Sequence, residues 1–239
     1  MSAIEITTQI GCSEKCSYCP QDKLIKAYRG KRKMSFTDFA VILQGIDSDI
    51  DIHFSGFCEP FLNKECADMI NLCIDTGHKV KVFTRLKNLT DNDYDVLNLL
   101  PAYSVYVHFD KNYDEYRFSK LLKPQNLILV GDHSLIGGLT DWIIDHQPII
   151  TRAGNIGTTD TCTGYYAIQC IDNRQNQWVV LPNGNAVICC MDYSLTTIVG
   201  NLKENSLYDL KRAEKYIKFC NDLKEGKNML CNKCFRGLK

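Results

Sequence analysis

The chain has 239 residues, of which 45% are hydrophobic and 23% charged; this composition indicates a globular protein with a substantial core and excludes a disordered chain. Its 28 basic and 28 acidic residues give zero net charge, so no overall attraction to nucleic acid is expected. The N-terminus lacks the basic and apolar regions of a signal peptide, and no stretch approaches the ~18 apolar residues of a membrane span. We therefore expect a cytoplasmic protein without a membrane partner.

Thirteen cysteines are the first unusual feature of the chain. In a reducing compartment they are not expected to form disulfides, and dense cysteines there favour metal binding.

Short β-type runs alternate with helical patterns over the first two-thirds of the chain. The strand candidates are 3–8, 51–55, 79–84, 104–109, 127–131 and 148–152. The helical patterns cover 36–44, 64–75, 91–99 and 113–122, the first of them preceded by Ser35 with Asp38 at capping-box spacing. This alternation predicts a parallel sheet with right-handed crossovers. Six units are too few for an eight-unit barrel, so we expect an α/β fold with a partial (β/α)6 TIM-like barrel over residues 1–155.

The pattern changes after this region, which predicts a small second domain over residues 156–239. Residues 154–164 are rich in Gly and Thr and resemble a linker. Asn183-Gly184 predicts a hairpin turn between strands at 178–181 and 186–189. A final helix is expected at about 206–222.

The loop after the first strand carries Cys12, Cys16 and Cys19 with the spacing C-x3-C-x2-C. Three thiolates can bind three irons of a 4Fe–4S cluster and leave the fourth iron open to a ligand. The alternative is a zinc site, but zinc normally has four ligands, and no further Cys or His follows at the usual spacing.

These cysteines, with the aromatic Tyr18 before the third, resemble the cluster-binding motif of the radical S-adenosylmethionine (radical SAM) superfamily. A second stretch, residues 55–60, resembles the Gly-Gly-Glu-Pro element that holds the cofactor's amino group, with Cys58 at the second glycine. At the third strand, Thr84 stands where Thr-Asn-Gly is common, whereas the next two residues depart from that pattern. The resemblance implies S-adenosylmethionine contacts from Tyr18, Gly56, Phe57, Cys58, Glu59, Pro60 and Thr84.

Three further residues are candidates for catalysis. His108 and Asp110 alternate onto one side of the fourth strand, where the family often places polar residues facing cofactor or substrate. Arg152 begins an Arg-x-Gly element that resembles one at the barrel rim of related enzymes. The alternatives are ordinary polar residues at a strand end and a surface arginine in a glycine loop.

A second cysteine set lies near the C-terminus. Cys170, Gly184 and Cys189 follow the spacing C-x13-G-x4-C, and a C-x2-C pair, Cys231 and Cys234, comes later. This order resembles the SPASM and shorter twitch domains of radical SAM enzymes, and it implies a second 4Fe–4S cluster on these four cysteines. Cys162 and Cys190 are rival ligands, and a four-cysteine zinc ribbon is the alternative.

Together the motifs imply an enzyme that forms a 5′-deoxyadenosyl radical and abstracts hydrogen from a small polar substrate. A closed second cluster suits electron transfer, which predicts a two-electron oxidation, and the motif order is similar to that of the 2-deoxy-scyllo-inosamine dehydrogenase type. The alternatives are a peptide maturase, a nucleotide-modifying enzyme and a non-enzymatic metal-binding regulator. A basic run over residues 23–33 forms either a solvated face, a docking site for flavodoxin or ferredoxin, or a contact to phosphorylated substrate.

Overall fold

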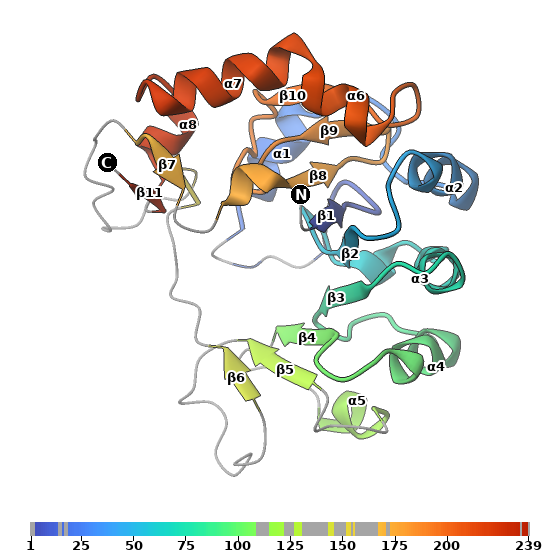
Figure 1. Cartoon of the computed structure of the whole chain (residues 1–239). Coiled ribbons are helices and arrows are strands. Elements are labelled where there is room, and N and C mark those ends of the chain that lie inside the picture. The colour runs from blue at the N-terminus through green and yellow to red at the C-terminus, as the bar shows by residue number, and fades with distance from the viewer. Residues whose placement is uncertain are drawn as a thin grey trace.

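The computed structural model describes residues 3–13, 16, 19–108, 115–121, 127–130, 143–145, 152–153, 155, 167–170, 173–234 and 236–238. Its centre is a nine-stranded sheet in the order β10-β9-β8-β1-β2-β3-β4-β5-β6 (Figure 1). The first six strands are β1 (Ala3–Ile6), β2 (Asp51–Phe54), β3 (Val80–Thr84), β4 (Val105–His108), β5 (Leu127–Val130) and β6 (Ile143–Asp145). Each pairs in parallel with the next, which confirms the predicted partial barrel.

Helices between these strands cover the outer face of the sheet (Figure 1). They are α1 (Gln21–Ala27), α2 (Phe36–Gln44), the 3-10 turn η1 (Pro60–Leu62), α3 (Cys66–Asp75), α4 (Asp91–Leu99) and α5 (Glu115–Ser119). The predicted cap of α2 is confirmed, since the side chain of Ser35 accepts a hydrogen bond from the backbone of Asp38. Helix α1 was not predicted and lies in the basic run.

The core between helices and sheet is apolar and closely packed. Phe39 of α2 and Met69 of α3 are fully buried and belong to the same cluster as Ile4, Ile52 and Val82 of the first three strands. Strands β2, β3 and β4 alternate buried and half-buried residues, because one face of the sheet packs against the helices and the other lines a cavity. This core fixes the ends of the strands, from which the functional loops start.

The sixth strand lies earlier than predicted. Strand β6 pairs with β5 at Ile143–Asp145, whereas Arg152, the last residue of the predicted strand, lies in a turn with Ala153. The rest of the predicted strand, 148–151, lies outside the described residues. Both segments contain an apolar β-branched pair, Ile143-Ile144 and Ile149-Ile150, so strand propensity alone does not distinguish them.

The C-terminal region continues the same sheet. Strand β8 (Gln177–Val180) pairs in parallel with β1, and the predicted hairpin joins it to β9 (Asn185–Val187), which is followed by β10 (Ile198–Asn201). Gly184 in the turn has φ +88°, and a Cβ there would lie 2.4 Å from the Asn201 side-chain oxygen. These three strands of the second region are therefore bonded to the barrel, and the domain boundary at 155/156 stays a prediction.

The remaining elements surround the end of this hairpin. They are β7 (Gln169–Cys170), paired with β11 (Gly237–Leu238), the 3-10 turn η4 (Arg174–Asn176), and helices α6 (Leu207–Arg212), α7 (Glu214–Lys224) and α8 (Met229–Asn232). The single helix predicted at 206–222 is wrong in one respect: Ala213 is extended, with ψ 141°, and separates α6 from α7. The predicted linker, 154–164, lies outside the described residues except for Asn155. Within the described part of the chain, no helix has the length and apolarity to cross a membrane.

Candidate functional site

A cavity of about 380 Å³ opens where the parallel strands end. Its lining includes all three cysteines of the first motif, Cys12, Cys16 and Cys19, together with residues 55–59 from the loop after β2. Loops at the carboxyl ends of parallel strands meet at one edge of a sheet, which is why segments so distant in sequence share this cavity.

The loop after β2 requires glycine at position 56. Gly56 has φ +73°, and a Cβ built on it would lie 2.3 Å from Oγ1 of Thr7. The same oxygen accepts a 3.1 Å hydrogen bond from the backbone N–H of Phe57. The loop thus approaches the end of β1 closely, and it brings the following residues beside the cysteine loop.

Glu59 is the fixed carboxylate of this loop. It is buried, and its two oxygens accept hydrogen bonds from Thr84 Oγ1 at 2.5 Å and from the Arg85 backbone N–H at 2.9 Å. Leu86 next to them has φ +54°, a conformation in which the family's usual glycine is less strained. Thr84 and Glu59 therefore form one unit across the ends of β3 and β2, and such a carboxylate can bind an ammonium group.

Two side chains donate hydrogen bonds to the cysteines of the first motif. Arg85 Nη1 lies 3.0 Å from Cys16 Sγ, and Gln21 Nε2 lies 3.6 Å from Cys19 Sγ. Gln21 also donates to the carbonyl of Phe57, so α1 connects the cysteine loop to the loop after β2. Burial raises the pKa of Cys19, which means that its thiol needs a metal or a nearby cation to lose its proton.

Cys58 lines the same cavity but differs from the three motif cysteines. Burial raises its pKa to about 12, and its sulfur lies 3.6 Å from Thr8 Oγ1. Thr8 in turn donates a 2.8 Å hydrogen bond to the carbonyl of Pro60. Cys58 therefore acts as a small, neutral residue at the position of the family's second glycine.

The structure describes two of the three catalytic candidates. His108 lines the cavity, with its ring centroid 6.3 Å from that of Phe83, and Arg152 lines it from the rim with φ +49°. Asp110 and Tyr18 lie outside the described residues.

The inner wall of the cavity is formed by strand residues that the sequence patterns did not predict. Glu5, His53 and Lys81 are register partners on β1, β2 and β3, and all three line the cavity, which places them on one face of the sheet. Phe83 and Tyr106 stack beside them with centroids 4.4 Å apart. The available signal was a polar residue in the middle of each of three apolar strands.

The polar groups of this wall have perturbed pKa values. Burial raises the pKa of Glu5 to about 8 although Arg174 Nη1 lies 3.5 Å from its Oε1. Burial lowers the pKa of His53 to about 4, so this imidazole is neutral at physiological pH.

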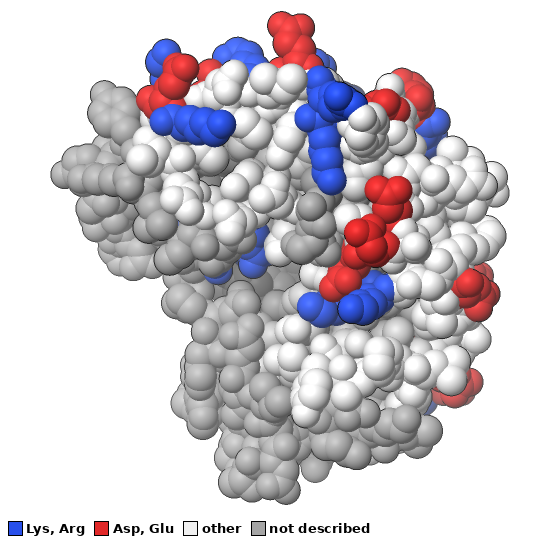
Figure 2. All heavy atoms as spheres, in the orientation of Figure 1, with Lys and Arg blue, Asp and Glu red and all other residues white. Residues whose placement is uncertain are grey.

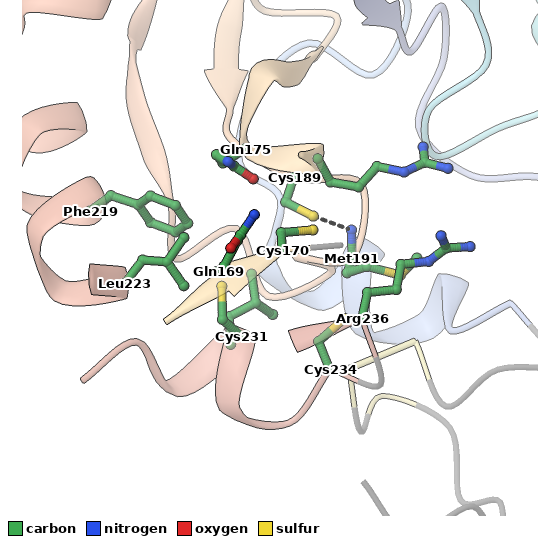
Figure 3. A pocket seen from close by; sticks show the side chains of 12 residues that line it. Gln169, Cys170, Gln175, Cys189, Met191, Phe219, Leu223, Cys231, Cys234 and Arg236 are labelled. Carbon is green, nitrogen blue, oxygen red and sulfur yellow. Dashed lines mark hydrogen bonds between the residues drawn. The ribbon is translucent and has the colours of Figure 1, made fainter. Parts of the chain in front are cut away.

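A second, small cavity of about 30 Å³ lies in the C-terminal region and is shown in Figure 3. Its lining includes all four cysteines predicted as auxiliary ligands, Cys170, Cys189, Cys231 and Cys234. They come from β7, from the segment after β9 and from α8 and its C-terminal end. Phe219 and Leu223 of α7 lie on one side of them, and Gln169, Gln175 and Arg236 also line the cavity (Figure 3). Burial raises the pKa of Cys231 to about 12, so a metal would have to displace its proton.

The two adjacent cysteines after β9 point to different cavities. Cys189 lines the small cavity, whereas Cys190 lines the large one. The other rival, Cys162, lies outside the described residues.

Among the described residues, no three Cys, His, Asp or Glu side chains converge closely enough to hold a single metal ion. A 4Fe–4S cluster binds each cysteine through a different iron, so its ligands stand further apart. Each cysteine set lines a single cavity and offers the thiolate ligands that such a cluster binds.

The basic run is only partly available to a partner. Lys31 pairs with Asp38 at 2.7 Å, and Lys33 lies 4.0 Å from Glu65. On the face in Figure 2, the described basic and acidic side chains lie among one another, in keeping with zero net charge.

Comparison with known proteins identifies the C-terminal part. Residues 170–235 match the family model of SPASM, an iron–sulfur cluster-binding domain. The C-terminal part of the chain is therefore similar to an iron–sulfur cluster-binding domain, and it follows an α/β partial barrel. This match confirms the SPASM resemblance predicted from the C-terminal cysteine motif. No curated protein sequence matches the chain.

Three solved structures show the likeness in fold. BtrN in complex with AdoMet and 2-DOIA is 20% identical with a TM-score of 0.74, covering 98% of this chain and 93% of BtrN. Native anSMEcpe with bound AdoMet and Cp18Cys peptide is 13% identical with a TM-score of 0.58, covering 98% of this chain and 86% of the other. Streptococcus suis SuiB bound to precursor peptide SuiA is 12% identical with a TM-score of 0.54, covering 98% and 70%. Solved structures with this fold therefore include one bound to AdoMet and 2-DOIA and two bound to peptides.

Proposed function

We propose that this chain is a radical SAM dehydrogenase that oxidises a hydroxyl group of a small polar substrate, such as a sugar or cyclitol. The observation that carries the proposal is the presence of two separate cysteine-lined cavities. One holds Cys12, Cys16 and Cys19 beside the Gly56–Glu59 loop, and the other gathers four cysteines.

Cys12, Cys16 and Cys19 would hold the first 4Fe–4S cluster, and Glu59 would accept hydrogen bonds from the amino group of S-adenosylmethionine. When bound and reduced, this pair supplies the 5′-deoxyadenosyl radical that abstracts a hydrogen atom from a C–H bond. Thr84 and Arg85 orient Glu59 for this contact. His108 and Arg152, which line the cavity, would contact the substrate. Asp110 would also contact the substrate, and Tyr18 would contact the cofactor.

Cys170, Cys189, Cys231 and Cys234 would hold the second cluster. With four cysteine ligands it has no open iron for substrate, so its role would be to accept the electron that remains after hydrogen abstraction. The net reaction is then a two-electron oxidation of an alcohol to a carbonyl group.

The TM-score of 0.74 with BtrN, whose complex contains the small molecule 2-DOIA, supports a small substrate. The scores of 0.58 and 0.54 with two peptide-bound proteins keep peptide modification as the second candidate. The two differ in one measurable respect: only a small-substrate dehydrogenase accelerates S-adenosylmethionine cleavage when a cyclitol is added.

Two further points of the proposal rest on the sequence. The first electron would come from flavodoxin or ferredoxin docked near the basic run, and the protein would act in the cytoplasm, where reducing conditions preserve the thiols.

The test is an anaerobic reconstitution followed by reduction and addition of deuterated 2-deoxy-scyllo-inosamine, with a short unstructured peptide as comparison. We expect the cyclitol to stimulate 5′-deoxyadenosine formation and to transfer deuterium into it. If only the peptide stimulated 5′-deoxyadenosine formation, the result would contradict dehydrogenation of a small molecule and favour peptide modification.

A further inference from the structure

Glu5 is the buried carboxylate of the large cavity that the proposed cofactor site does not use. It lies in the middle of β1 on the inner face, with 6% of its surface exposed, and its register partner His53 is beside it. The other buried carboxylate of the lining, Glu59, is engaged by Thr84 and Arg85 at the opposite end of the β2 loop. Glu5 is thus placed to meet a substrate rather than the cofactor.

Arg174 connects Glu5 to the second cavity. This arginine lines both the large and the small cavity. Its Nη1 lies 3.5 Å from Glu5 Oε1 and 3.9 Å from Cys190 Sγ. It stands in η4, between Cys170 on β7 and the strand β8 that pairs with β1, so the chain itself positions this side chain between the two cavities.

We propose that Glu5 accepts the hydroxyl proton of the substrate, and that its ion pair with Arg174 couples this proton transfer to reduction of the auxiliary cluster. The inference rests on the proposed function.

The atoms and electrons balance. Hydrogen abstraction by the deoxyadenosyl radical leaves a hydroxyalkyl radical on the substrate carbon. Its O–H bond then breaks, and the proton forms an O–H bond on the Glu5 carboxylate. The resulting substrate radical anion loses one electron to the oxidised auxiliary 4Fe–4S cluster, and its carbon–oxygen bond becomes double.

The coupling follows from charge. While Glu5 is ionised, it compensates the positive charge of Arg174. Once Glu5 is protonated, the guanidinium charge acts on the neighbouring cluster without that compensation, which favours the reduced, more negative cluster. Proton acceptance therefore promotes the electron transfer that completes the reaction.

The pKa of Glu5 supports this role. Burial raises it to about 8, which makes the carboxylate a stronger proton acceptor than an exposed one. The charged or titratable groups around it are His53 on β2, Lys81 on β3, and Arg152, Arg174 and Cys190 from the C-terminal part of the chain. His53 does not titrate near pH 8, because burial lowers its pKa to about 4. Cys190 requires a control of its own.

The experiment uses the full chain with Cys12, Cys16 and Cys19 replaced by alanine, so that only the auxiliary cluster is reconstituted. Its reduction is followed by electron paramagnetic resonance at fixed applied potentials between pH 6.5 and 9.5. We expect the ratio of reduced to oxidised cluster at one potential to fall about tenfold as pH rises through 8, which is a shift of about 59 mV for one electron.

In this background, Glu5→Gln should remove the pH dependence and hold the ratio at its low-pH value. Glu204→Gln, at an exposed carboxylate, and Cys190→Ser should both keep the dependence. If Glu5→Gln does not fold, Arg174→Gln tests the same link: loss of this cation raises the pKa of Glu5 further, so the midpoint of the pH dependence should move to higher pH.

A pH dependence that persists in Glu5→Gln, a midpoint that Arg174→Gln leaves unchanged, or a parent protein without pH dependence overturns the inference. Absence of iron from the parent protein would instead contradict the proposed auxiliary cluster. The two failures are therefore distinguishable.

Discussion

Thr84 Oγ1 lies 2.5 Å from Glu59 Oε1 and joins the end of β3 to the loop that follows β2. Arg85 extends this connection, since its backbone N–H bonds Glu59 and its side chain bonds Cys16. One short segment therefore orients both the carboxylate proposed to hold S-adenosylmethionine and a proposed cluster ligand.

Replacing Thr84 tests this orientation. Thr84→Val keeps the shape but removes the donor to a buried carboxylate, which costs about 1.5–3 kcal/mol. We expect S-adenosylmethionine to bind roughly 10- to 100-fold more weakly by calorimetry. Thr84→Ser retains the hydroxyl and serves as the control; equal loss in both variants would show that the hydrogen bond has no role in binding.

Gly56 and Gly77 have similar backbone conformations but differ in the space available for a side chain. Both have positive φ, +73° and +82°, but a Cβ at Gly56 would meet Thr7 Oγ1 at 2.3 Å, whereas none of the surroundings of Gly77 lies within 4 Å. We expect Gly77→Ala to lower the free energy of unfolding by about 1–2 kcal/mol and Gly56→Ala to lower it clearly more. Denaturant unfolding measures both values, and similar losses would mean that the β2 loop moves away from Thr7 at little cost.

Cys189 and Cys190 should differ in iron binding. In the chain that lacks the first three cysteines, Cys189→Ser should lose most of the about four irons expected for one cluster, while Cys190→Ser should retain them. Iron analysis after reconstitution measures this difference. Loss of iron from Cys190→Ser but not from Cys189→Ser would show that Cys190, and not Cys189, binds the cluster.

The pH profile of product formation should follow Glu5. Its folded-state pKa is raised from 4.5 to about 8, so the carboxylate form needed to accept a proton increases as pH rises through 8. Product formation per 5′-deoxyadenosine should therefore rise across this range and level off above it. In Glu5→Gln we expect deuterium transfer to persist while product falls at least tenfold; an unchanged ratio would assign the proton to another acceptor.

Local patterns predicted much of the fold. The helix at 36–44 and its Ser35 cap, the hairpin turn at Asn183-Gly184 and the parallel order of the strands depend on neighbouring residues and could be predicted from spacing. The position of β6 could not be predicted, because the Ile-Ile pairs at 143–144 and 149–150 both suit a strand. Ala213, which separates two helices, carries no helix-breaking signal at all.

The candidate site likewise contains residues that local sequence predicts and residues that it does not. The cysteine motifs and the Gly56–Glu59 element are each short segments of sequence, so their residue types and spacing alone indicate the chemistry. Glu5 and Arg174 are 169 residues apart and meet only because β8 pairs with β1, which no local pattern predicts. Likewise, the assignment of Cys189 and Cys190 to different cavities depends on which way each side chain faces.

The central claim is that Cys12, Cys16 and Cys19 hold a cluster that cleaves S-adenosylmethionine. It is tested most directly by the amount of 5′-deoxyadenosine formed after anaerobic reconstitution and dithionite reduction. We predict that the wild-type chain forms 5′-deoxyadenosine and that the Cys12/Cys16/Cys19 triple-alanine variant forms none, although the variant still binds iron at its C-terminal cysteines. Absence of 5′-deoxyadenosine from the fully reconstituted wild-type protein, or equal amounts from both proteins, would contradict it.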